Sequence, residues 1–328
     1  MNAARLLIQL ALAAGYATAA AEYPEKPVTV IVPFSTGSDA DLAARNLAQH
    51  VAKHLGSAAI LIVNQPGASG ATGTHAVQDA APDGYTLLLA RIASQVILPA
   101  TDPRTPYRWS DFSYLGLLEI NPFVCAVRRE APFRTMTDLV NEISKRPGRL
   151  KFATVGPGTL QNFGPQYLLS LLHIPKDAAV GVPYRGSGEL AAALASGQVD
   201  FACSNLGALL PHLRSGSLRA LMTTSRAPLK ELPGTPTARR LSWPDMEQLS
   251  AWSALAGPAG LPQEVSGRWA GALAKLAKDP EWTSATSALG SQPAVRAPAE
   301  TREFVRVQYD LYENLSKQFG LRVPSRRD

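Results

Sequence analysis

The sequence predicts an α/β fold with two lobes, each built around a mainly parallel sheet. Strands and helices alternate along the chain, which is typical of parallel sheets with helices packed on their faces. A unit of strand, polar loop and helix occurs twice, once near residue 37 and again near residue 158. With 328 residues, the chain is long enough for two domains of ordinary size.

The first 21 residues resemble a secretory signal peptide. Arg5 precedes an apolar run over residues 6–12, and Ala19-Ala20-Ala21 fits the small-x-small cleavage rule. The run is too short to span a bilayer as a permanent helix. A buried N-terminal helix is the alternative interpretation. We expect residues 1–21 to be removed and the mature protein to be periplasmic.

The elements follow in order from the apolar pattern. Residues 28–34 are rich in β-branched side chains, which predicts a buried parallel strand. Ser38 or Asp39 is a good N-cap for the next helix, which ends at Gly56. Further strands are expected over residues 59–63, 85–89, 123–127, 150–154, 180–183, 199–204, 218–223 and 252–257. Further helices are expected over residues 74–80, 136–146, 161–172, 188–196, 264–278 and 298–317.

These elements suggest how the lobes are connected. No low-complexity linker separates them, so we expect strands to cross a hinge. Lobe 1 is expected to comprise residues 22–124 and 225–328, and lobe 2 residues 125–224. The last two helices are expected to pack on lobe 1.

Charge and cysteine content exclude some functions and leave others open. The net charge of +6 is spread along the chain without a basic run interleaved with aromatics, which argues against nucleic-acid binding. The positive charge favours anionic ligands or serves solubility alone. Cys125 and Cys203 lie in apolar, strand-like runs. They either pair in an oxidising compartment or remain buried thiols.

Searches for catalytic patterns find none. The chain lacks Gly-x-Ser-x-Gly, the phosphate-loop pattern and His-Glu-x-x-His. His50 and His54 have the spacing of a metal pair, but no third ligand is evident, so a solvated helix face is expected. Asp39 and Asp41 suit a helix start, where they complement its dipole. We therefore expect no enzyme activity, no metal and no cofactor.

Two polar loops, residues 35–39 and 156–162, supply the positive signal for binding. Each runs from the end of a strand into a helix N-terminus, where unpaired N–H groups favour an anion. Ligands of open α/β sheets bind beyond the carboxyl ends of the strands. Two such loops facing each other would hold one carboxylate from both sides. The alternative is that both loops contact only water. The candidate side-chain donors are Ser35, Thr36, Ser38, Thr159 and Asn162.

A resemblance to a known family emerges at these loops. Several short segments occur in a fixed order along the whole mature chain, and together they resemble the Bug family of periplasmic solute receptors. That family supplies the substrate-binding component of tripartite tricarboxylate transporters. The segments are Tyr23-Pro24 with Lys26-Pro27, Ile31-Val32-Pro33-Phe34, Asp41 with Arg45, Asn64 to Gly70, Ala81 to Leu88, Gly156 to Thr159, Val182 to Ser187, Gly197 to Asp200, Leu210-Pro211-His212, Leu218 to Leu221, Pro258-Ala259-Gly260 and Asp279-Pro280.

The resemblance implies a two-lobed, type II periplasmic-binding-protein (Venus-flytrap) fold with a small carboxylate between the lobes. It implies ligand contacts from one loop of each lobe. Ser94 and Asn205 are expected at the variable end of the site, and Tyr184 has either a binding or a packing role. The loop residues implied are Phe34, Ser35, Thr36 and Gly37 on lobe 1 and Gly158, Thr159 and Asn162 on lobe 2.

Four departures from the family pattern affect the ligand's identity. Asp39 stands where glycine is usual, so it repels an acidic ligand or attracts the amine of an amino-acid-like one. Arg91 stands where small residues are usual, and it clamps a second carboxylate or neutralises Asp39. Asn162 replaces a common histidine, and Ser69 a common glycine.

The expected function is that of a monomeric transport receptor. Ligand binding would shift an open–closed equilibrium, and membrane subunits of a tripartite tricarboxylate transporter would recognise the closed form. The alternative partner for the closed form is the periplasmic domain of a sensor kinase.

Overall fold

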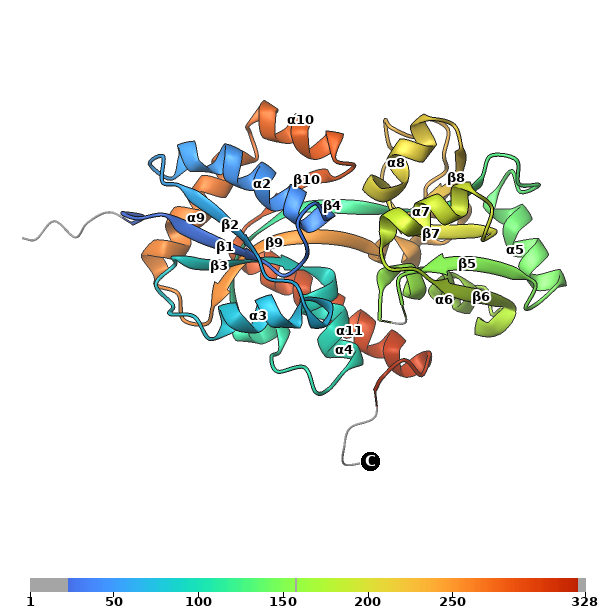
Figure 1. Ribbon diagram of the computed structural model, residues 1–328, viewed down its shortest axis with the longest axis horizontal. Coiled ribbons are helices and arrows are strands. Elements are labelled where there is room, and N and C mark those ends of the chain that lie inside the picture. Colours follow the sequence, from blue (N-terminus) through green and yellow to red (C-terminus); the bar gives the residue numbers. More distant parts are fainter. Residues whose placement is uncertain (1–22, 157, 324–328) are drawn as a thin grey trace, which may run out of the picture.

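Two groups of strands, joined by one shared strand, form the framework of the molecule. The computed structural model describes residues 23–156 and 158–323, so the predicted signal peptide lies outside the described residues. Figure 1 shows the two groups as lobes side by side along the long axis, each covered by helices. The predicted two-lobed α/β architecture is confirmed.

The first sheet is parallel at one edge and antiparallel in its middle. Strand β1 (Val28–Val32) lies between β2 (Ile60–Asn64) and β3 (Thr86–Arg91), and both pairings are parallel. Strand β9 (Ser250–Pro258) continues the sheet antiparallel to β3. Strand β10 (Gln292–Arg296) pairs antiparallel with the shared strand.

The second sheet repeats this plan on a smaller scale. Strand β5 (Leu150–Thr154) pairs in parallel with β6 (Ala179–Pro183) and β7 (Phe201–Asn205). Strand β7 and strand β8 (Leu218–Thr223) both pair antiparallel with the shared strand.

The shared strand, β4 (Phe112–Arg128), is 17 residues long and changes partners near its middle. It pairs with β9 as far as Pro122, and from Phe123 onward it pairs with β7. The sequence predicted only the second half of this strand. Its first half contains Glu119, whose charge interrupts the apolar pattern expected of a buried strand.

Ten α-helices cover the described parts of the sheets, and most agree with the predicted positions to within a few residues. The sequence did not predict α4, α8 or α10. The helices are α2 (Asp39–Val51), α3 (Ala71–Gln78), α4 (Leu98–Thr101), α5 (Met136–Lys145), α6 (Leu160–Leu171), α7 (Ser187–Ala195), α8 (Leu206–Arg214), α9 (Gln263–Leu276), α10 (Pro280–Ala288) and α11 (Pro298–Gln318).

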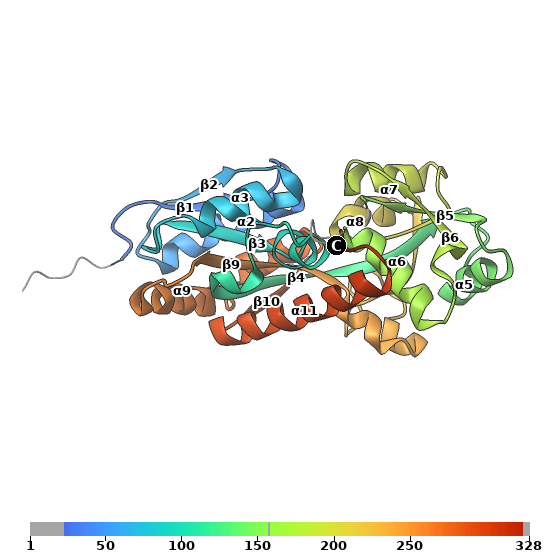
Figure 2. The same cartoon turned by 90° about the horizontal axis from the view of Figure 1, so that it is seen from below.

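Helix α11 extends across both lobes. It was expected to pack on lobe 1 alone, and that expectation is wrong for its carboxyl end. The ring of Tyr312 lies 5.3 Å from that of Phe163 in α6, and Lys176 donates to the carbonyl oxygen of Phe319 over 2.9 Å. Figure 2 shows α11 running along the underside, from below β10 toward α6.

Alternate residues of β1 belong to two different cores. Val28, Val30 and Val32 are buried in the core that includes α2 and α9. Ile31 lies in another core, together with Val77 of α3. Successive side chains of a strand point to opposite faces of its sheet, so α2 and α3 cover opposite faces. Helix α2 follows β1 along the chain and α3 follows β2, so both helices start at the edge where these parallel strands end.

A disulfide joins two strands of lobe 2. Cys125 of β4 and Cys203 of β7 are direct cross-strand partners, and they are bonded to each other. Both residues are buried. The sequence left this pairing open, and the structure decides in favour of the bond. Such bonds persist in oxidising compartments.

We predict that the double variant Cys125→Ala/Cys203→Ala loses about 4 kcal/mol of unfolding free energy, because the bond closes a long loop in the unfolded chain. The two cysteines are separated by 78 positions. Urea denaturation with and without a reductant measures the effect. The reductant should destabilise the wild-type protein and leave the double variant unchanged. Equal stability of the two oxidised proteins would contradict the prediction.

Candidate functional site

Both predicted binding loops lie where the two lobes meet. Asp39, at the start of α2, lines a cavity together with residues of α8 from the other lobe. Gly158, in the loop before α6, approaches α4 of lobe 1, and a Cβ atom added to it would lie 3.7 Å from Thr101 Oγ1. The carboxyl ends of β1 and β5 therefore lead into the interlobe region, as the sequence predicted.

Asp41 organises the loop between β1 and α2. Its carboxylate accepts the Gly37 N–H at 2.9 Å, Arg45 Nε at 3.0 Å and Asn64 Nδ2 at 3.0 Å. Burial acts to raise the pKa of Asp41, but the hydrogen bonds from Arg45, Gly37 and Asn64 outweigh it and lower the pKa. Asp41 is therefore ionised at neutral pH and holds the loop in one conformation.

Internal hydrogen bonds occupy much of this first loop. Asn64 Nδ2 also donates to the Phe34 carbonyl oxygen at 3.0 Å, and Thr36 Oγ1 donates to Asn64 Oδ1 at 3.2 Å. The Ser38 N–H bonds to the Ser35 carbonyl oxygen, and Ser38 Oγ caps α2. The first loop therefore offers a ligand fewer main-chain donors than the sequence predicted.

The loop before α6 has a more open helix N-terminus. Thr159 is the N-cap residue of α6, but its side chain makes no capping bond. Its hydroxyl instead donates to the Gly156 carbonyl oxygen at 2.7 Å. The positive end of the α6 dipole is thus available to an anion. Asn162 is buried in the first turn, where Oδ1 accepts a hydrogen bond from Gln166 at 3.1 Å.

The other predicted site residues have differing environments. Ser69 is exposed in the turn after β2, with a φ of 56°. Ser94 is fully buried, so it presents no accessible atom in this conformation. Tyr184 packs against the core of lobe 2, which supports the packing role. Asn205 is buried before α8, and its Oδ1 has no hydrogen-bond partner among the described residues.

Arg91 pairs with an acidic residue that the sequence did not single out. Its Nη1 lies 3.6 Å from Glu119 Oε1 and donates to Ser253 Oγ at 2.7 Å. Both charged side chains are buried. Arg91 is thus paired with Glu119 rather than with Asp39.

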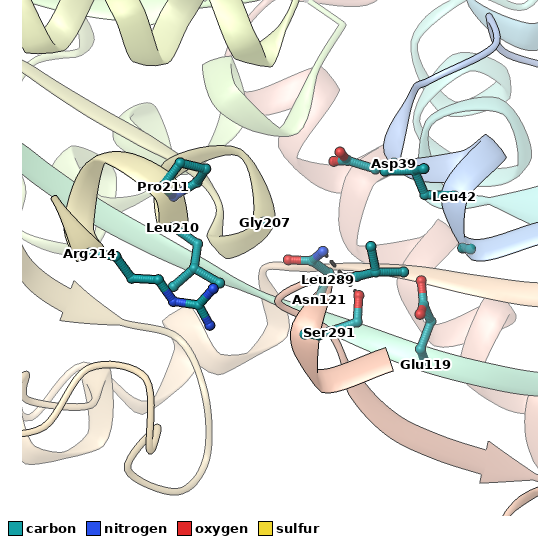
Figure 3. A pocket seen from close by; sticks show the side chains of 12 residues that line it. Asp39, Leu42, Glu119, Asn121, Gly207, Leu210, Pro211, Arg214, Leu289 and Ser291 are labelled. Carbon is teal, nitrogen blue, oxygen red and sulfur yellow. Dashed lines mark hydrogen bonds between the residues drawn. The ribbon is translucent and has the colours of Figure 1, made fainter. Parts of the chain in front are cut away.

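One cavity of about 170 Å³ is lined by both lobes. Figure 3 shows Arg214 on one side, Asp39 and Glu119 on the other, and Asn121 and Ser291 between them. Of the residues predicted for the site, only Asp39 lines this cavity. The lining residues are Asp39, Leu42, Ala43, Glu119, Asn121, Gly207, Leu210, Pro211, Arg214, Ala288, Leu289 and Ser291.

The backbones of the two lobes approach each other closely beside this cavity. A Cβ atom on Gly207, in α8, would lie 2.6 Å from the Leu289 carbonyl oxygen. A Cβ atom on Gly290 would lie 2.8 Å from the Gly207 backbone. Only glycine allows this approach, and Gly290 also has a φ of 80°.

A buried polar network forms the floor of the cavity. Ser253 Oγ donates to Glu119 Oε1 at 2.8 Å, and Asn121 Nδ2 donates to Ser291 Oγ at 3.2 Å. Burial raises the pKa of Glu119, while Arg91 and the hydroxyls of Ser253 and Ser291 act in the opposite direction. The Arg91–Glu119 pair supplies the compensation that a buried charge requires.

The sequence did not identify Glu119, Asn121, Arg214 or Ser291 as site residues. A signal existed for two of them, because Glu119 and Asn121 are polar residues within an otherwise apolar stretch. Such residues are expected to have buried partners. Arg214 and Ser291 carried no such signal, since α8 and the turn before β10 were not predicted.

His50 differs from its expectation. It was expected on a solvated helix face, but it is buried, and its Nδ1 lies 3.9 Å from Asp279 Oδ2. With Glu281, these residues form a group that has the composition of a metal site. Lys53 Nζ lies 2.6 Å from the same Asp279 oxygen, so a cation of the protein already pairs with Asp279.

A family model described as the tripartite tricarboxylate transporter family receptor matches residues 43–321. The chain belongs to this receptor family. It is 29% identical over 331 residues to protein BugT of Bordetella pertussis, covering 98% of this chain and 100% of BugT. The resemblance to Bug receptors that the sequence indicated is therefore confirmed.

Solved structures of periplasmic receptors share the fold of this receptor. Periplasmic binding protein BugD superposes with a TM-score of 0.77 at 26% identity, covering 92% of this chain and 99% of BugD. MatC from Rhodopseudomonas palustris, solved with bound malate, gives 0.76 at 28% identity, covering 89% and 99%. The two-lobed periplasmic-binding-protein fold is confirmed. No helix among the described residues is long and apolar enough to cross a membrane.

We predict that Asp41→Asn lowers the unfolding free energy by about 2 kcal/mol at pH 7, because a charged acceptor of three hydrogen bonds is lost. Since folding lowers the pKa of Asp41, its contribution is present above the unfolded value near about 4. The contribution disappears as the pH falls through the folded value. Denaturation at pH 7 and pH 3 measures both effects.

Asp39→Asn is the matched control for this prediction, because it removes a neighbouring acid that makes no hydrogen bond or ion pair within the described residues. It should leave stability nearly unchanged at both pH values. A difference between Asp41→Asn and wild type that stayed constant down to pH 3 would contradict the electrostatic role of Asp41.

Proposed function

We propose that this protein is a periplasmic solute receptor. It captures a small carboxylate between its lobes and delivers it to the membrane subunits of a tripartite tricarboxylate transporter. Membership of the receptor family supports the binding role, and the malate bound in MatC supports the ligand class. The Cys125–Cys203 disulfide suits an oxidising compartment such as the periplasm.

The cavity lined by both lobes is the observation that carries this proposal. A ligand that contacts both lobes at once binds the closed form better than the open form, and so it shifts the population toward closure. The volume of about 170 Å³ suits a small ligand. A cavity of about 150 Å³ accommodates benzene, whereas sites for drug-sized ligands begin near about 300 Å³.

Two features of lobe 2 attract a carboxylate. Arg214 makes no ion pair within the described chain, and its guanidinium group points into the cavity in Figure 3. The N-terminus of α6 offers its dipole beside Gly158 and Thr159. Arg214 lines the cavity, whereas Gly158 and Thr159 lie outside its lining. We assign these two and the other loop residues to the ligand site from the family pattern.

The hinge follows from the connections between the sheets. We place lobe 1 at residues 22–124 and 225–328 and lobe 2 at residues 125–224, with β4 crossing between them. The receptor performs no chemistry on its ligand, acts as a monomer, and starts near residue 22 after loss of its signal peptide.

A thermal-shift screen of the mature protein against carboxylates and amino acids tests the function. At least one small carboxylate should raise the melting temperature, and calorimetry should give one site per chain. Failure of every carboxylate and amino acid to bind would overturn the proposal. If the ligand were recovered in a chemically changed form, the proposal that the receptor does not alter its ligand would be wrong.

We predict that Arg214→Ala weakens carboxylate binding at least about 10-fold, because it removes a charged donor to the ligand. Calorimetry with the carboxylate identified by the screen measures the loss. Arg146→Ala is the control, since Arg146 is an exposed arginine directly after α5 that pairs with Glu142 at 3.3 Å. Similar affinities for the two variants would remove Arg214 from the site.

We predict that Thr159→Ala weakens ligand binding several-fold and leaves the melting temperature nearly unchanged. The hydroxyl fixes the loop before α6 through a single bond to Gly156 in a partly exposed segment. Thr159→Ser keeps this bond and should restore the affinity. If the alanine variant binds as tightly as wild type, Thr159 has no part in ligand binding.

A further inference from the structure

We propose that the interlobe cavity selects a zwitterion: a small carboxylate that also carries a protonated, N–H-donating nitrogen, as an α-amino acid does. The buried, unpartnered Oδ1 of Asn121 and the unpaired carboxylate of Asp39 face one cavity with Arg214 opposite them. This ligand class narrows the proposed function and rests on it.

The direction of the buried hydrogen bonds determines which side-chain atom of Asn121 has no hydrogen-bond partner. Arg91 Nη1 donates to Ser253 Oγ, and Ser253 Oγ donates to Glu119 Oε1. Ser291 Oγ accepts a hydrogen bond from Asn121 Nδ2, so Oδ1 is the atom of Asn121 that remains without a donor.

Asn121 is consequently held in one orientation. Its Nδ2 faces Ser291 at 3.2 Å, and its Oδ1 has no partner among the described residues. Figure 3 shows Oδ1 pointing away from Ser291, toward the side of the cavity where Arg214 lies. The residue is only 2% exposed. A buried acceptor without a donor is unfavourable, and a ligand N–H group removes that deficit.

Asp39 adds a formal negative charge to the same cavity. It lies in the first turn of α2 and lines the cavity, and its carboxylate makes no hydrogen bond or ion pair with the described residues. The neighbouring acid, Asp41, is fully engaged by Gly37, Arg45 and Asn64. Only one of these two carboxylates is therefore available to a ligand.

The charge balance of the cavity favours a zwitterion over a dianion. Glu119 is paired with Arg91, which leaves Asp39 and Arg214 as unpaired opposite charges on the two lobes. A dicarboxylate finds one cation there and is repelled by Asp39. An amino acid places its carboxylate toward Arg214 and its ammonium toward Asp39 and Asn121 Oδ1, so both unpaired charges are satisfied.

Calorimetry with matched ligand pairs tests this selectivity. Each pair shares a carbon skeleton and differs in the α-amino group: propionate and alanine, succinate and aspartate, glutarate and glutamate. In the pair that binds best, the amino member should bind at least about 10-fold tighter to the wild-type protein.

Asp39→Asn should reduce the affinity for that amino acid at least about 10-fold while leaving the matched carboxylate unchanged or tighter. Asp177→Asn, which alters an exposed acid outside the cavity, is the control and should keep the wild-type preference. The Asp39 variant leaves the Ser38 cap of α2 in place, and its unchanged melting temperature would show that it folds.

The outcomes separate the two proposals. Equal or tighter binding of the amine-free member in every pair overturns the zwitterion and leaves the carboxylate receptor standing. A preference for the amino acid that survives in Asp39→Asn also overturns it. If no member of any pair binds, the proposed receptor function is wrong, and the proposed selectivity for a zwitterion is wrong with it.

Discussion

The main-chain ladder of β4 is the constraint on which both lobes depend. The first half of the strand pairs with β9 and the second half pairs with β7, so the same 17-residue segment belongs to both sheets. Because ladder bonds on both sides of Pro122 are satisfied within different sheets, the change of partners supports the hinge that we propose there. The relative positions of the two strand-to-helix loops depend on this one strand.

The same strand carries the charge that shapes the interlobe cavity. Glu119 is buried within β4, and it requires Arg91 from β3 and Ser253 from β9 to remain there. Arg91 of β3 thus accompanies an acid of β4, with β9 lying between these two strands in the sheet. Because Arg91 is engaged by Glu119 and Ser253, it neither binds a ligand directly nor neutralises Asp39.

Periodicity and turn chemistry were sufficient to predict the two-lobed α/β fold, the strand-to-helix loops and a cap of α2 at Ser38 or Asp39, which the structure assigns to Ser38. They failed where an element depends on distant contacts. The first half of β4 carries Glu119, which only Arg91 and Ser253 make tolerable in a strand. The cavity could not be predicted because it is assembled from α2, α8 and the turn before β10, which are far apart in sequence. The loop at Gly37 was located correctly, but its hydrogen bonds to Asp41 and Asn64 depend on side-chain positions that no local pattern encodes.

The glycine contact between the lobes has a mechanical consequence. With backbone already touching backbone at Gly207 and Gly290, the lobes cannot approach further along that edge. The contact limits how far the lobes can close. The adjacent cavity therefore keeps a minimum width even without a bound solute. A side chain at either position would collide with the backbone of the other lobe, and it would therefore favour a conformation in which the lobes are further apart.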